Sequence, residues 1–136
     1  MEGLGRTFNV VPTADGVEVN CRDTSAVTFV CVGADTYTVQ EAQDAAGTGA
    51  RNLAVITHYY ENASAAGANA WTKATQAAGA AVTTAAAVAV IEVSTKSLAD
   101  GYTHLKCSST ATGLVTAITH DLTVQRDPRN LPAAAV

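Results

Sequence analysis

The sequence predicts an all-β fold: a β-sandwich or jelly-roll-like double antiparallel sheet with extended N- and C-terminal arms. Short runs of β-branched residues are separated by Gly, Asp, Asn and Ser, and turn signals recur about every 8 to 15 residues. A chain of 136 residues holds one core and not two. We therefore predict a single domain over 1–126 that includes a short N-terminal arm, and an extended tail over 127–136.

Ten runs have the composition of strands. They span 8–11, 17–21, 26–33, 35–42, 52–62, 71–76, 80–84, 88–95, 102–110 and 114–124. The run 26–33 is apolar on both faces, which predicts a central strand covered on both sides. In 35–42, Tyr37 and Val39 alternate with polar neighbours, which predicts a strand with one buried face. The runs 80–84 and 88–95 read as a further strand pair.

The segment 38–46 is ambiguous. The tetrapeptide TVQE fits a helix capping box, and AQDAA has helix propensity. Gly47 and Gly49 leave room for only about two turns, which is marginal for an isolated helix. We expect a strand that ends near Glu41, followed by a loop or a single helical turn.

The last two strand runs, 102–110 and 114–124, predict a β-hairpin around Gly113. The register that keeps the apolar residues on one face places Leu105 opposite His120 and His104 opposite Asp121. This register puts His104 on the outer face and His120 on the inner face. Two histidines on opposite faces do not converge on a metal ion.

No residue pattern indicates catalysis or a bound cofactor. The three histidines stand in no ligand motif, and the three cysteines have no CxxC spacing. Cys31 lies in the most apolar run, which favours a buried thiol over a nucleophile. Tyr59 and Tyr60 point to opposite faces, so one of them is a candidate for exposure, whereas Trp71 is expected in the core. We predict no catalytic residue, no metal and no cofactor.

The composition argues against several partners. Lys and Arg are scattered singly and the net charge is -4, which argues against nucleic-acid binding. No apolar run is long enough to span a membrane, and no signal peptide is visible, so we expect an intracellular product. Charged residues make up only 15% of the chain, which suits burial in an assembly.

Several stretches resemble a family of small structural proteins from tailed phages that infect actinobacteria. They are AVTFVCVGADTYT, NLAVITHYY and SLADGYTHLKC followed by GLVTAITHDLTVQR, within a resemblance over about residues 17 to 132. The resemblance implies a virion protein made in the host cytoplasm and placed on the capsid surface. Its implied partner is the major capsid protein, and its implied activity is cementing, with no catalysis.

On this basis we expect a capsid decoration protein that self-associates, with a homotrimer as the natural guess. A tail-tube or head–tail connector subunit, and a carbohydrate-binding or adhesion module that uses Tyr60 or Trp71, are the alternatives. Extended arms suit docking between subunits. The predicted interface residues are Arg126, Asp127, Pro128, Arg129, Asn130, Leu131, Pro132 and Tyr60.

Overall fold

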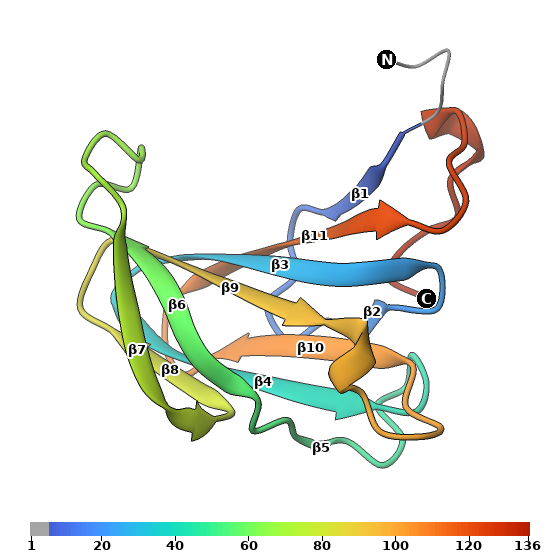
Figure 1. Cartoon of the computed structure of the whole chain (residues 1–136), viewed down its shortest axis with the longest axis horizontal. Helices are drawn as coiled ribbons and strands as arrows, with labels where there is room; N and C mark the ends of the chain where they lie inside the picture. Colours follow the sequence, from blue (N-terminus) through green and yellow to red (C-terminus); the bar gives the residue numbers. More distant parts are fainter. Residues whose placement is uncertain (1–5) are drawn as a thin grey trace.

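A computed structural model describes residues 6–136 and shows the predicted all-β sandwich, in which two antiparallel sheets pack together (Figure 1). The larger sheet has six strands in the order β1–β11–β3–β9–β6–β7. These strands span Phe8–Val11 (β1), Leu114–Leu122 (β11), Thr24–Val32 (β3), Val88–Ser94 (β9), Ile56–Asn62 (β6) and Thr72–Gly79 (β7). The predicted arm lies mostly in residues 1–5, outside the described part of the chain.

The smaller sheet has the order β2–β10–β4–β5. In addition, β8 pairs with the first half of β4, residues 35–38. These strands span Val19–Asn20 (β2), His104–Ser109 (β10), Asp35–Ala42 (β4), Arg51–Asn52 (β5) and Ala81–Thr84 (β8). Two short 3-10 turns, η2 (Thr95–Ser97) and η3 (Pro128–Asn130), complete the described elements. The predicted pairing of 80–84 with 88–95 is wrong, because β8 joins β4 whereas β9 joins β3 and β6.

The central position predicted for 26–33 is confirmed, because β3 lies between β11 and β9. Val27, Phe29 and Cys31 point into the sandwich and are fully buried. The expectation of cover on both sides is wrong, since Val30 and Val32 are only half-buried on the other face. This outward side has apolar residues and no second layer over it among the described residues.

The ambiguity at 38–46 resolves as a strand that continues to Ala42 and then turns. Tyr37 and Val39 are buried, while Thr36, Thr38 and Gln40 are half-buried on the outer side, as the alternation predicts. The Asp44 carboxylate accepts hydrogen bonds from the main-chain N–H groups of Ala46 and Thr48. These bonds and the glycines that follow favour a turn over a helix.

The predicted hairpin of 102–110 with 114–124 is wrong. The two strands are consecutive in sequence but belong to different sheets: β10 pairs with β4 and β2, and β11 pairs with β3 and β1. The residues between them therefore cross from one layer of the sandwich to the other. The same crossing occurs between β3 and β4, which also follow each other in sequence and lie in opposite sheets.

The two crossings are joined by Asp35 and Tyr37. The Asp35 carboxylate accepts hydrogen bonds from the N–H groups of Ala111 and Gly113, at 3.0 and 2.9 Å. The Tyr37 hydroxyl donates to the Gly33 carbonyl at 2.7 Å, and burial raises the pKa of Tyr37 to about 12. Gly33 has a φ of 117°, which favours glycine. Asp35 thus ties the β10–β11 crossing to the β3–β4 crossing, and the Tyr37–Gly33 hydrogen bond closes the β3–β4 crossing locally.

The Asp35 contacts predict an acid-sensitive loop. The hydrogen bond from the Gly113 N–H, with those from other nearby main-chain groups, holds the pKa of Asp35 below its usual value of 3.8. A lowered folded-state pKa means that the stabilisation is present above pH 3.8 and disappears as the pH falls through the folded-state value. In NMR titrations, the amide signals of Ala111 and Gly113 should therefore shift with a midpoint below 3.8. The Asp35→Asn variant should show no such titration, and a midpoint at or above 3.8 in the native protein would contradict the assignment.

Candidate docking surfaces

The chemically versatile side chains are dispersed through the fold. His104 is buried, with Nδ1 2.8 Å from the Thr103 hydroxyl, whereas His120 faces outward and has Nδ1 2.9 Å from the Asp121 carboxylate. His104 lies on the predicted outer face of its sheet, since it alternates with the inward Leu105 and Cys107, but the main chain of Val136 covers it. Its predicted pairing with Asp121 and the inward position predicted for His120 are wrong, because the two strands lie in different sheets. Within residues 6–136, no group of three or more His, Cys, Asp or Glu side chains is arranged to hold a metal ion.

The cysteines are buried thiols in the described structure, as expected for Cys31. Burial raises the pKa of the Cys21 thiol to about 12, which keeps it protonated near neutral pH. Cys31 and Cys107 come from facing sheets, and their sulfur atoms lie 4.0 Å apart. Neither is placed as an accessible nucleophile.

The outer face of the six-stranded sheet carries apolar side chains and no covering element in the described chain. The strand registers place Val10 opposite Ile118, Val30 opposite Val90, and Val90 opposite Tyr60. We use "outer face" for this group, which comprises Phe8, Val10, Val30, Tyr60, Val90, Leu114 and Ile118. Leu114 is 66% exposed, so part of the face is fully open to solvent.

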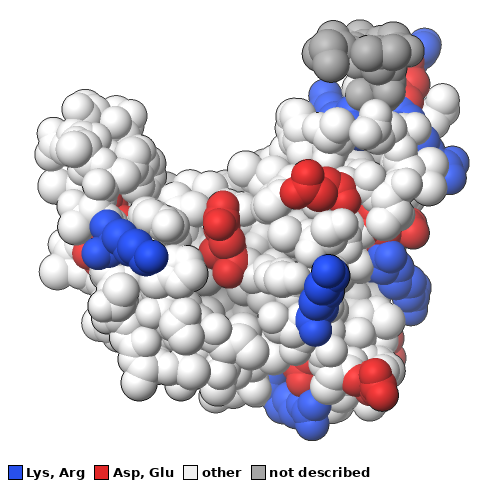
Figure 2. Space-filling model, in the orientation of Figure 1, with Lys and Arg blue, Asp and Glu red and all other residues white. Residues whose placement is uncertain are grey.

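Charged residues are unevenly spread over the molecule. Figure 2 shows scattered charged residues and an uncharged lobe, which is the loop between β6 and β7 in Figure 1. The surface is hollowed between this lobe and the end of the molecule that carries β1. A weakly charged, hollowed surface with apolar residues has the composition of a protein contact more than of a nucleic-acid contact.

Two aromatic residues lie toward the β6–β7 side of this surface: Tyr60 on β6, and Trp71 just before β7. Tyr60 is half-buried on the outer face, and the His58 ring meets it edge-on at 5.9 Å between centroids. The expectation that Trp71 belongs to the core is wrong, because this residue is 49% exposed. It stands at the end of the uncharged loop, just before an edge strand, where no second sheet covers it.

The predicted interface segment 126–132 begins at the edge of the larger sheet. The Arg126 carbonyl accepts a hydrogen bond from the Arg6 N–H at 2.8 Å. Asp127 then caps the 3-10 turn by accepting from the Arg129 N–H, and Pro128 occupies the first turn position. The extended conformation expected here is therefore interrupted. Asp127 and Arg129 form an ion pair at 3.0 Å, and Arg129 is highly exposed.

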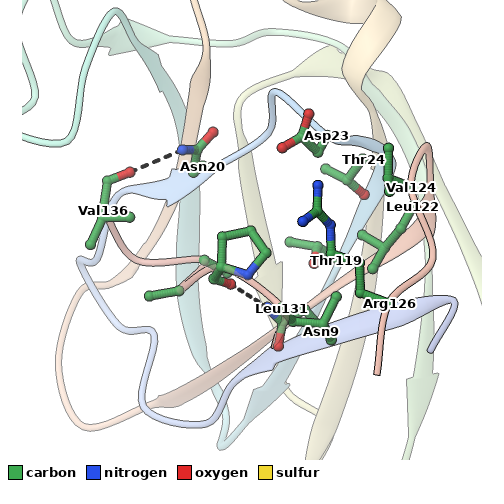
Figure 3. Close-up of a pocket in the computed structure, with 13 residues that line it drawn as sticks. Asn9, Asn20, Asp23, Thr24, Thr119, Leu122, Val124, Arg126, Leu131 and Val136 are labelled. Carbon is green, nitrogen blue, oxygen red and sulfur yellow. Dashed lines mark hydrogen bonds between the residues drawn. The ribbon is translucent and has the colours of Figure 1, made fainter. Parts of the chain in front are cut away.

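The residues after this turn, 131–136, lie back along their own domain (Figure 3). The Pro132 carbonyl accepts from the Asn9 side chain at 3.0 Å, and the Ala134 carbonyl accepts from the Asn20 N–H at 2.7 Å. The main-chain oxygen of Val136 lies 2.9 Å from Nε2 of His104. The segment 131–136 thus covers the opening between the edge strands β1 and β2.

A cavity of about 150 Å³ lies under the segment 131–136. Its walls combine Leu122, Val124 and apolar residues of the segment with the polar side chains of Asn9, Asn20 and Thr119. Figure 3 shows the Arg126 side chain pointing into this space toward Asp23 and Thr24. The segment is therefore held by its hydrogen bonds together with the packing of Ala134 against the core.

We expect these hydrogen bonds to hold the segment 131–136 against the domain. Replacing Asn9 by alanine removes the bond to the Pro132 carbonyl and should speed hydrogen exchange of the Asn20 amide about fivefold, because one such bond contributes about 1 kcal/mol. Asn52→Ala, on the remote strand β5, is the matched control and should leave this amide unchanged. An unchanged Asn20 amide in Asn9→Ala would show that the segment is held by other contacts.

Comparisons with known proteins identify no relative: no protein-family model matches the chain, and no curated protein or solved structure does so either. Among residues 6–136 the structure contains no helix long and apolar enough to cross a membrane.

Proposed function

We propose that this protein is a structural component of a phage virion that binds the outer capsid lattice and reinforces it. The observation that supports this proposal best is the outer face, a set of apolar side chains that lie among polar ones such as Thr28, Thr116 and Glu92 on a side of the six-stranded sheet that no described element covers. A protein whose task is to contact many identical copies of one lattice needs an extended binding surface and no catalytic group. The major capsid protein is the proposed partner, and self-association, with a homotrimer as the guess, is part of the proposal.

The apolar side chains on the outward side of the larger sheet support this assignment. An antiparallel sheet that faces water normally alternates apolar and polar residues, with the polar side outward. Here the opposed pair Val30–Val90 places apolar side chains outward on the central strands β3 and β9, and Val10–Ile118 does so at the β1 edge. Monomeric proteins rarely leave large contiguous apolar surfaces uncovered, and such surfaces mark interaction sites.

The C-terminal segment has a narrower proposed role than a free arm. Residues 131–136 are engaged with their own domain, whereas the turn Pro128–Asn130 projects from it with Arg129 highly exposed. In this proposal the turn contacts a neighbouring subunit at the rim of the outer face. Tyr60, at the other end of the sheet, contributes an amphipathic contact, as aromatic residues do at interfaces.

Binding to assembled capsids tests the proposal. Val10→Glu adds a charge to the outer face at a partly exposed edge-strand position and should weaken binding at least tenfold while the domain stays folded. Ala81→Glu, on an exposed position of β8 in the other sheet, is the matched control and should bind like the native protein. Equal binding to free capsid subunits and to assembled particles would count against cementing.

The copy number in purified particles separates decoration from the connector or tail-tube alternative. Hundreds of copies per particle are expected for a decoration protein. A ring of six or twelve copies would assign the chain to the connector, and complete absence from particles would overturn the virion proposal.

Carbohydrate binding is the second candidate, and the exposed indole of Trp71 favours it. An exposed aromatic ring beside polar side chains is a common platform for sugars, and Tyr60 and His58 lie on the neighbouring strand β6. A glycan array should then give a signal that Trp71→Ala removes. An array without signal would eliminate this candidate.

A further inference from the structure

We infer that Cys31 and Cys107 are a latent disulfide pair that staples the two sheets of the sandwich together under oxidising conditions. Cys31 lies on β3 at the centre of the larger sheet, and Cys107 lies on β10 in the smaller sheet. Both side chains are fully buried, and their sulfur atoms are 4.0 Å apart. The inference stands independently of the proposed function.

The surroundings favour this pair over any other. Cys31 is flanked in its sheet by Val115 and Ala89, and Cys107 is flanked by Val39 on one side and by Asp15 on the other. A disulfide needs sulfur atoms about 2 Å apart, which requires each to move by about 1 Å through side-chain rotation. The third cysteine, Cys21, directs its sulfur to the Val19 carbonyl at 3.3 Å.

The burial of both thiols makes formation of the disulfide slow in the folded protein. The hydrogen bond between the two thiols and their removal from water raise the pKa of Cys31 far above its usual range. Because the thiolate is the attacking form, exchange in the closed sandwich is slow. The bond therefore closes during folding or in a transiently opened state, and once closed it is shielded from reductants in the same way.

The chemistry balances with a low-molecular-weight disulfide such as oxidised glutathione as the oxidant. One protein thiolate attacks a glutathione sulfur and releases one reduced glutathione, which takes up the proton lost by the cysteine. The second cysteine attacks the resulting mixed disulfide at the protein sulfur and releases the other glutathione, again with its proton. Two protein thiols are thereby oxidised to one disulfide, and one glutathione disulfide is reduced to two thiols.

The disulfide would restrict the unfolded chain. It ties the central strand of one sheet to a strand of the other and closes a long loop from Cys31 to Cys107, and long loops give the largest restriction of the unfolded chain. In a reducing cytosol the chain folds with free thiols. Combined with the proposed virion role, the bond would close after release of the particle into an oxidising medium, and only slowly, through transient opening of the folded domain.

Oxidative refolding tests the inference on the full chain. The protein is refolded in a glutathione redox buffer or with a reductant, alkylated, and digested with trypsin, which separates the cysteines onto peptides 7–22, 23–51 and 107–126. We expect a crosslinked pair of 23–51 with 107–126, a mass loss of two hydrogens, and one alkylated thiol on 7–22. Three alkylated thiols after oxidation, or a crosslink that includes 7–22, would overturn the inference.

Thermal unfolding tests the stapling. The oxidised protein should melt about 10 °C above the reduced protein, and Cys21→Ser should show the same difference. Cys107→Ser should show no difference between the two buffers. A disulfide that forms without raising the Tm would overturn the stapling role, and the native-chain peptide map decides the pairing even if Cys107→Ser does not fold.

Discussion

Replacing Gly113 by alanine is expected to lower the free energy of unfolding by about 3 kcal/mol, the upper end of the usual cost of overpacking. Gly113 lies at the crossing from β10 to β11, directly against the Tyr37 ring. A Cβ atom there would contact the Tyr37 hydroxyl oxygen and would lie 2.7 Å from Cε1 of the ring. The ring is fully buried and its hydroxyl is bonded to the Gly33 carbonyl, so it has no free space to move into.

Urea denaturation measures the effect, and two variants show its cause. Gly79→Ala is the matched control, because a Cβ there would meet only ordinary contacts at 3.5 Å, and we expect a change within about 0.5 kcal/mol. In a Tyr37→Ala background, Gly113→Ala should cost little, since the colliding ring is gone. An equal cost in both backgrounds would mean that the contact with Tyr37 is not the reason.

Replacing Lys106 by methionine is expected to lower the free energy of unfolding by about 3 kcal/mol. The Lys106 ammonium lies 3.0 Å from Oε1 of Glu18, whose side chain is only 9% exposed. Gly47 covers the carboxylate: a Cβ added to it would lie 3.1 Å from Oε1. The other oxygen, Oε2, has no hydrogen-bond partner in the described structure, so Lys106 is the charge that compensates the buried carboxylate.

A double-mutant cycle separates this effect from lost packing. Glu18→Met with Lys106→Met removes both charges and should recover at least half of the loss, because two apolar side chains of similar size replace a buried ion pair with little penalty. Urea denaturation of the two single variants and the double variant provides the measurement. Additive losses would show that the pair contributes nothing beyond its packing.

Most strands and their buried faces could be predicted from the sequence. The alternation in 35–42 correctly placed Tyr37 and Val39 inside, and the apolar run 26–33 was correctly placed in the middle of a sheet. Alternation works because successive side chains on a strand point to opposite faces. It reports which side of a strand meets the core, but both sheets of a sandwich share that core.

The pairing of strands could not be predicted for the same reason. The segments 102–110 and 114–124 read as a hairpin because a short glycine-containing connection joins them. The same connection also suits a crossing between layers. Asp35, distant in sequence, holds it in the crossing form by accepting hydrogen bonds from Ala111 and Gly113.

The candidate docking surfaces could likewise be predicted only in part from the sequence. Composition indicated a weakly charged surface suited to assembly, and the adjacent tyrosines indicated that one of them is exposed; Tyr60 is the more open of the two. The exposure of Trp71 was missed, because nothing local to it shows that β7 is an edge strand with an uncharged loop before it. The return of residues 131–136 was also missed, since its partners Asn9, Asn20 and His104 lie far away in sequence.

The sequence by itself determined that this chain forms an all-β sandwich, where most strands lie and which side chains enter the core, because these follow from a local period of two. Only the tertiary structure decided which strands pair, that the outer face stays uncovered, and that Cys31 meets Cys107 across the core. Each of these depends on contacts between residues far apart in the chain. Such contacts form only when the chain closes around a shared core, and no local pattern specifies them.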